Sequence, residues 1–300
     1  MRYLPTSKLT PGMALGQDIY DGAGRLLLAK HLLLSEEYIS NLEFLGFPGI
    51  YIDDEFTQGI EIQQVLNPQV RSQALKVVHD MFAFDVDSDA EEDMPVSEIK
   101  IQKTIERIVE NILSNGDIMC NVLDIKNYDD YIYYHSINVA MMSVLLGANY
   151  GMNEESLYQL TTAAILHDIG KIAVPDAVLN KPSRLTDGEY ELMKKHTIWG
   201  KEILAGLEFL PQADMGAAYH HERFDGKGYP YGIKGDKIPD IVRIISAADS
   251  LDAMSSNRCY RRHCDKDYII SEFEKGAGTQ FDADVAQVVV ELIKEGRIIL

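Results

Sequence analysis

Apolar residues recur at helical spacing along most of this chain. Between residues 97 and 115 they fall on one face of a helix, at Ile101, Ile105, Ile108, Val109 and Ile112. This spacing predicts an amphipathic helix over 97–115, and a similar pattern predicts a second helix over 60–84. Helical patterns also dominate from about residue 120 onward. The hydrophobic pattern therefore predicts a mainly α protein.

The first 58 residues follow a different pattern. Short apolar runs at 18–20 and 25–29 flank the glycine-containing stretch 21–24, which predicts a strand, a turn and a strand. Ser35 is a candidate N-cap for a helix that Gly46 would end, and residues 50–52 predict a last strand. We therefore predict three parts: a small α/β N-terminal module over 1–58, a helical connector over 59–118, and an all-helical domain over 119–300.

An acidic run interrupts the predicted connector. Residues 85–93 hold six acids in nine positions and few apolar groups, which is typical of a solvated linker. A calcium loop is the alternative, but the run lacks the glycine and the terminal glutamate at the required spacing.

Charge and composition narrow the class of protein. The formal net charge is −19, which disfavours nonspecific binding to nucleic acid polymers or anionic membranes. A small anionic substrate is still compatible, because a local cluster of metals and basic groups can dominate one cleft. No run of 18 apolar residues predicts a membrane span, and residues 1–10 do not resemble a signal peptide. Three cysteines without a CxxC pair favour a reducing, cytoplasmic location.

Five of the eight histidines fall between residues 135 and 221, close to carboxylates. Taken singly, each has an ordinary explanation, such as a packed histidine or a helix cap. Two adjacent histidines are harder to explain by packing, and an acid inside the apolar run 244–251 is costly to bury unless it is paired or bound to metal. The candidate metal ligands are His135, His167, Asp168, His196, His220, His221 and Asp249.

Together these residues point to a metal centre. Imidazole and carboxylate groups suit iron, manganese, nickel or zinc. A bridging carboxylate can hold two cations ~3.5–4 Å apart, as in two-metal phosphodiesterases. The absence of suitable cysteines argues against structural zinc.

Several motifs resemble the HD superfamily of metal-dependent phosphohydrolases. His167-Asp168 resembles the signature pair of that superfamily, and residues 220–230 resemble the second signature, HHExxDGxGYP, of its HD-GYP subgroup. The resemblance covers roughly residues 120–275, and the second signature is specific because many of its positions are fixed. Residues 8–13 and 24–27 resemble a small module often placed before HD-GYP domains.

The resemblance implies hydrolysis of cyclic di-GMP to linear pGpG, and in some members further to GMP. It implies two divalent or mixed-valence metal ions, with iron or manganese favoured. His135, His167, Asp168 and Asp249 would hold one ion, and Asp168 would bridge to a second ion held by His196, His220 and His221. Asp168 and Lys171 would be catalytic, with Lys171 on a phosphate oxygen. The expected substrate-binding residues are Lys171, Gly228, Tyr229, Arg258 and Arg261, although the two arginines could equally be solvated charges.

The chain departs from the family pattern at three positions. Tyr131 stands where members with three metals carry a glutamate, so we predict two metals. Phe224 replaces the frequent Trp or Tyr, and Cys259 stands where proline is usual. Neither of these two changes alters a proposed ligand, so we expect an active enzyme.

Alternatives to cyclic di-GMP hydrolysis remain open at this point. The substrate could be 3′,3′-cyclic GMP-AMP, because the motifs do not separate the two cyclic dinucleotides. The chain could instead be a signalling module that binds a cyclic dinucleotide with weak or no cleavage, although no ligand is lost. A protein partner could dock on the GYP loop or on residues 1–58. The apolar face at 101–112 suits a homodimer as well as packing within the chain.

Overall fold

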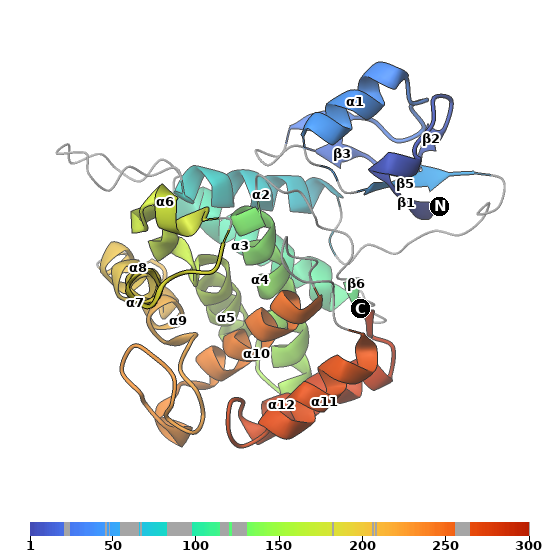
Figure 1. The fold of residues 1–300 in the computed structure, drawn as a ribbon. Coiled ribbons are helices and arrows are strands. Elements are labelled where there is room, and N and C mark those ends of the chain that lie inside the picture. Colours follow the sequence, from blue (N-terminus) through green and yellow to red (C-terminus); the bar gives the residue numbers. More distant parts are fainter. Residues whose placement is uncertain are drawn as a thin grey trace.

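The computed structural model describes residues 1–20, 25–45, 47, 49–54, 66, 68–82, 98–114, 120–121, 131–181, 183–205, 207, 209–255 and 265–299. Most of these residues are helical, and strands occur chiefly in a small N-terminal unit (Figure 1). The predicted fold class, mainly α with a small α/β module in front, is confirmed. Buried apolar residues form two separate clusters, one within residues 9–52 and one within residues 66–298.

The N-terminal module is built on a three-stranded antiparallel sheet. Strand β5 (Gly49–Asp53) lies in the middle, between β1 (Arg2–Pro5) and β2 (Ala14–Leu15). The Ser35 hydroxyl accepts a hydrogen bond from the Tyr38 amide at 3.2 Å, as expected of an N-cap. The remaining elements are η1 (Thr6–Lys8), the hairpin of β3 (Ile19–Tyr20) and β4 (Leu26–Leu28), and helix α1 (Glu36–Phe44). The predicted turn at 21–24 and Gly46 lie outside the described residues.

The two helices that follow pack into the core of the large helical domain. Helix α2 (Pro68–Phe82) contacts α3 (Glu98–Ser114) and α4 (Tyr131–Tyr150), and α3 contacts α4 and α5 (Glu154–Leu166). The five apolar residues predicted on one face of α3 are all buried in that core. The amphipathic face therefore packs within the chain, because its apolar stripe meets α2, α4 and α5. The acidic run at 85–93 lies outside the described residues.

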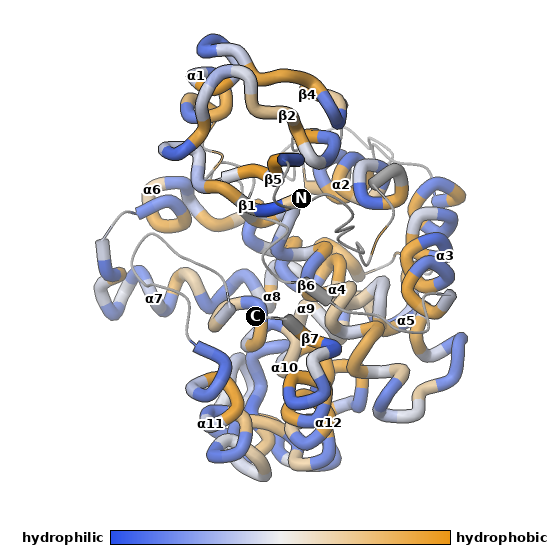
Figure 2. The backbone as a smooth tube through the Cα atoms, turned by 90° about the vertical axis from the view of Figure 1, so that its right-hand side faces the viewer, coloured by the Kyte–Doolittle hydropathy of each residue, from blue (hydrophilic) through white to orange (hydrophobic). Residues whose placement is uncertain are grey.

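Helix α4 is the centre of the domain. It is apolar around most of its circumference, as expected of a helix buried on several sides. It packs against α5, α10 (Asp240–Ser255) and α12 (Ala283–Lys294). Figure 2 shows hydrophobic segments of α4, α10 and α12 close together. No helix in the described ranges is long and apolar enough to span a membrane.

The rest of the domain wraps around this centre. Helix α8 (His196–Leu204) packs on η4 (Ile169–Ala173) and on α9 (Ala213–Tyr219), and α9 packs on α5. The elements after α5 are η4 (Ile169–Ala173), α6 (Asp176–Leu179), α7 (Asp187–Lys194), α8 (His196–Leu204), α9 (Ala213–Tyr219), η5 (Gly235–Lys237), α10 (Asp240–Ser255), α11 (Lys266–Gly276) and α12 (Ala283–Lys294). A short parallel ladder joins β6 (Cys120–Asn121) to β7 (Ile298–Ile299) near the C-terminus.

Candidate metal centre

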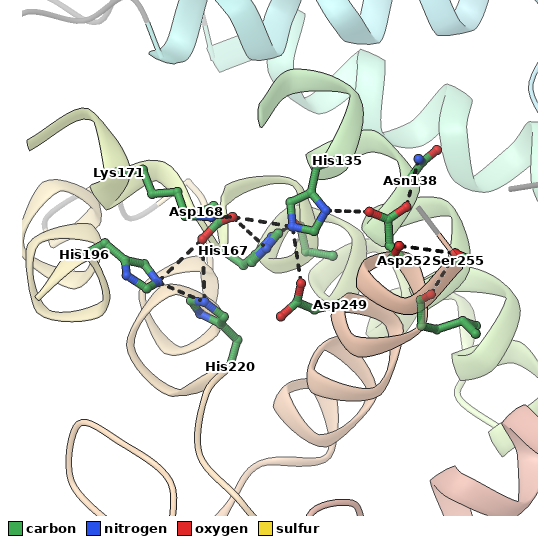
Figure 3. A network of polar contacts seen from close by, with 12 residues as sticks. His135, Asn138, His167, Asp168, Lys171, His196, His220, Asp249, Asp252 and Ser255 are labelled. Carbon is green, nitrogen blue, oxygen red and sulfur yellow. Dashed lines mark hydrogen bonds and ion pairs between the residues drawn. The ribbon is translucent and has the colours of Figure 1, made fainter. Parts of the chain in front are cut away.

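The seven predicted ligands lie in or directly after five helices and meet at one place, and Figure 3 labels all of them except His221. His135 lies in the second turn of α4, while His167 caps the C-terminus of α5 and is followed by Asp168. His196 is the first residue of α8, His220 caps α9 and precedes His221, and Asp249 lies on α10. Three overlapping groups of these side chains have their ligand atoms within 4.8 Å of one another: His196, His220 and His221; His135, His167 and Asp249; His167, Asp168 and His220.

Asp168 lies between two sets of imidazoles. Its Oδ2 atom is 3.5 Å from His135 Nε2 and 3.3 Å from His167 Nε2. Its Oδ1 atom is 3.5 Å from His196 Nε2 and 3.7 Å from His220 Nε2. Each carboxylate oxygen therefore faces a different group of nitrogens, which is the arrangement of a carboxylate shared between two positions.

Main-chain carbonyls fix the protonation of three of the imidazoles. The Nδ1 atoms of His167 and His196 lie 2.7 Å from the carbonyl oxygens of Ala164 and Met193, and His220 Nδ1 lies 3.0 Å from that of Gly216. Because a carbonyl oxygen only accepts hydrogen bonds, Nδ1 must carry the proton. In the neutral rings the Nε2 lone pairs then point toward the centre, as in histidine ligands of metals.

The spacing of these nitrogens fits a shared cation, and their close approach has no hydrogen-bonding explanation. His196 Nε2 and His220 Nε2 are 3.3 Å apart, so two lone pairs face each other at close range. Two nitrogens about 2.0–2.1 Å from one shared cation would lie roughly 3–3.5 Å apart. His167 Nε2 is fully buried and makes no hydrogen bond with any described residue. The donor set is thus suited to a metal site.

Burial and mutual charge set the protonation of the site. Burial would raise the pKa of Asp168, but Lys171 and His167 outweigh burial and hold that pKa well below its usual value. Asp249 is also desolvated, yet the hydrogen bond and charge of His135 lower its pKa. Burial lowers the pKa of His196 and His220, and it lowers the pKa of His221 to about 4. At neutral pH Asp168 and Asp249 are therefore ionised and His196, His220 and His221 are neutral, which are the forms that bind metal.

We predict that the metal-free protein loses stability as the pH falls from about 6.5 toward 4. The unfolded chain takes up protons on these imidazoles near pH 6.5, whereas the folded chain resists protonation of His221 down to about pH 4. Protons therefore favour the unfolded state within this window. The lowered pKa values of Asp168 and Asp249 act only below the usual carboxylate range. The measurement is the urea midpoint in the presence of EDTA at pH 7.5 and pH 5, with the lower midpoint expected at pH 5.

His221→Gln should reduce this pH dependence, because it removes one buried imidazole. His31→Gln, a change in the exposed side chain of the N-terminal module, is the matched control and should leave the dependence unchanged. Equal midpoints at the two pH values in the unsubstituted chain would contradict the assignment of neutral, buried imidazoles.

The other predicted site residues that the structure describes, Lys171, Gly228 and Tyr229, lie beside this cluster. Lys171 is partly exposed, and its Nζ is 2.5 Å from Asp168 Oδ2. The Tyr229 ring packs on the His221 ring, with centroids 4.8 Å apart. Gly228 packs against the backbone of residues 221–223 so closely that an added Cβ would lie 2.4 Å from the Arg223 nitrogen. Arg258 and Arg261 lie outside the described residues.

Three side chains that contact a proposed ligand or hold the neighbouring loop were not singled out by the sequence pattern. Asp252 Oδ2 lies 2.7 Å from His135 Nδ1, and Asp252 Oδ1 accepts a hydrogen bond from Asn138. Glu222 is buried and accepts hydrogen bonds from the amides of Tyr231 and Gly232, which holds the loop after His221. The available signal was spacing, because Asn138 and Asp252 each follow a proposed ligand by three residues and so share its helix face.

The comparisons with known proteins agree with this geometry. Residues 119–285 match the family described as HD domain. A cyclic di-GMP phosphodiesterase of Thermotoga maritima is 37% identical over 187 residues, covering 60% of this chain and 50% of that protein. A 3′3′-cGAMP-specific phosphodiesterase (number 2) of Vibrio cholerae is 35% identical over 159 residues, covering 52% of this chain and 30% of that protein. The chain thus spans half the length of these curated relatives or less.

One solved structure is similar along nearly the whole chain. Bd1817, an HDG"Y"P protein from Bdellovibrio bacteriovorus, superposes with a TM-score of 0.64 over 98% of this chain and 99% of that chain. The sequences are 17% identical, so this match shows a shared fold. Since the family match covers more than half of the residues and includes all seven proposed ligands, the chain belongs to the HD domain family, as its HD-GYP motifs predicted.

Proposed function

We propose that this protein is a metal-dependent phosphodiesterase that hydrolyses cyclic di-GMP to pGpG. One observation carries the proposal: Asp168 presents one carboxylate oxygen to each of two imidazole groups in a buried site. A carboxylate shared in this way suits two cations, and a pair of cations suits phosphodiester cleavage. The cyclic di-GMP phosphodiesterase of Thermotoga maritima supports the substrate class.

The residues divide between two metal positions. His135, His167 and Asp249 would hold one ion, and His196, His220 and His221 the other, with Asp168 shared. Iron or manganese is favoured because oxygen and imidazole donors suit both. When bound, the ions would activate a water for attack on phosphorus and offset negative charge on the phosphate.

Side chains at the edge of the centre would bind the phosphodiester. Lys171 carries a positive charge beside Asp168 and can contact a phosphate oxygen. Burial raises the pKa of Tyr229 far above its usual value, and the nearby Tyr190 raises it further, so the Tyr229 hydroxyl stays protonated. A neutral hydroxyl in this position can donate a hydrogen bond to the substrate. Because Gly228 has no side chain, its backbone can lie close to the backbone of His221, and this places the neighbouring Tyr229 beside the site.

A second candidate substrate is 3′,3′-cyclic GMP-AMP. The relative from Vibrio cholerae supports it, because its identity to this chain is close to that of the Thermotoga maritima enzyme. A pure receptor role is less well supported, since every predicted ligand side chain reaches the cluster.

The test combines metal content with turnover. The protein would be purified aerobically and anaerobically, analysed for metals, and assayed with cyclic di-GMP and with cyclic GMP-AMP on the same preparations. We expect about two iron or manganese ions per chain and formation of pGpG, with loss of turnover after chelation and recovery on adding metal back. Metal without cleavage of either cyclic dinucleotide would favour a receptor, and absence of bound metal in both preparations would overturn the ligand assignment.

A further inference from the structure

Asp252 lies directly behind His135, on the side away from the shared carboxylate (Figure 3). It is fully buried on α10, one turn after Asp249. Its Oδ2 atom lies 2.7 Å from His135 Nδ1, and its Oδ1 atom accepts a hydrogen bond of 3.0 Å from Asn138 Nδ2. Both oxygens are thus held in place by groups from α4.

This arrangement sets His135 apart from His167, His196 and His220. Those three imidazoles place Nδ1 against neutral main-chain carbonyls, whereas His135 places it against a carboxylate. A carboxylate behind a histidine fixes the orientation of the ring and raises the basicity of its outer nitrogen. His135 Nε2 is the atom that faces Asp168 and Asp249.

The two halves of the centre consequently differ in charge. The half around His135 has Asp249 as its own carboxylate, with Asp252 behind it. The half made of His196, His220 and His221 has three imidazoles and no carboxylate of its own among the described residues. Both halves share Asp168. Negative charge close to a cation strengthens its binding in a buried site of low dielectric.

We propose that Asp252 is a positioning residue that acts through His135 and makes the His135 half the tighter of two cation positions. This inference rests on the metal centre of the proposed function. It predicts ordered loading, in which the first cation occupies the site of His135, His167, Asp168 and Asp249. The second cation then binds the three imidazoles of the other half.

The experiment is a titration of the metal-free 300-residue chain with Mn²⁺ alone, in competition with a chelator. The unsubstituted chain is expected to show a tight and a weaker binding event. Asp252→Asn keeps the size of the side chain and removes its charge, and it should weaken the tight event roughly 10–100-fold, the usual effect of losing such a partner. The weaker event should be unchanged. Asp267→Asn, an exposed change in the first turn of α11, is the matched control.

A second variant separates contact from charge. The exchange Asp252→Asn with Asn138→Asp retains the net charge and the volume of the pair but moves the carboxylate away from His135. We expect Mn²⁺ binding to stay weakened in this double variant. Recovery to the unsubstituted affinity would show that nearby charge suffices, and it would overturn the positioning role.

The titration and urea unfolding together separate the positioning role from a structural role and from failure of the proposed function. Urea midpoints of the metal-free variants report any damage to the fold. If Asp252 had only a structural role, Asp252→Asn would lower the midpoint without selectively weakening the tight binding event. An unchanged tight event, or equal weakening of both events, in Asp252→Asn would overturn the inference and leave the proposed function standing. Failure of the unsubstituted chain to bind Mn²⁺ or any other metal would overturn the proposed function itself.

Discussion

Asp168→Asn is expected to lower cyclic di-GMP turnover by about 10³-fold or more and to reduce the metal content of the purified protein. Asp168 approaches four imidazoles, from both halves of the site. Metal ions supply several kcal/mol of transition-state stabilisation in such reactions, and each 1.36 kcal/mol is about tenfold in rate. An amide has no full negative charge to share between two cations. The measurement is turnover together with elemental analysis of the same sample.

The same change at an exposed site controls for loss of a carboxylate in general. Asp267→Asn should retain both metal and turnover, because its side chain lies on the surface of α11. If Asp168→Asn loaded two metals per chain and kept full turnover, a shared carboxylate could not be central to the chemistry, and the two-metal assignment would fail.

Gly170→Ala is expected to destabilise the fold by about 3 kcal/mol or more. Gly170 lies in η4, where a Cβ would meet the His196 carbonyl oxygen at 1.9 Å and the Gly200 nitrogen at 2.4 Å. Both contacts are with backbone, so no side-chain rotation can relieve them, and overpacking of this kind costs roughly 1–3 kcal/mol or more. The measurement is the urea midpoint of the metal-free protein, which should fall by about 1 M or more at typical denaturant sensitivities.

Gly170→Ala should also weaken metal binding. The glycine allows the segment that carries Asp168 to approach the start of α8, where His196 lies, and an added methyl group would push the two apart. Gly188→Ala is the matched control. Apart from Gly188 itself, its chain neighbours and its own helix backbone, no atom of the described residues lies within 4 Å of a Cβ at Gly188, which is in the first turn of α7. Replacement of an open helical glycine usually adds up to about 1 kcal/mol of stability. Equal stability of the Gly170→Ala and Gly188→Ala proteins would contradict the close packing of η4 on α8.

Much of the local structure was predictable because it depends on neighbours in the sequence. The spacing of Ile101 to Ile112 predicts both the helix and its buried face, and α3 has both. Ser35 caps α1 as predicted, since capping needs only a side-chain oxygen and amides in the next turn. The seven proposed ligands could likewise be selected from the sequence, because metal binding by imidazole and carboxylate groups follows from residue type.

The convergence of those ligands was decided by the tertiary structure. His135 and Asp249 are far apart in sequence, yet His135 Nε2 lies 3.3 Å from Asp249 Oδ1 because α4 packs on α10. The HD-GYP resemblance implied that they meet, but the residues alone could not show it. The role of Asp252 depends on the same packing, because its burial and its contact with His135 arise only where α10 lies against α4.

The sequence by itself thus determined the helical class, the small N-terminal module and the chemistry of the donor groups, since each depends on residue type and local spacing. The tertiary structure alone decided which oxygen of Asp168 faces which imidazoles and why η4 requires a glycine at position 170. It also decided which hydrogen-bond partner lies behind His135. These features arise where helices distant in the chain pack together, and no local pattern encodes the distances between them.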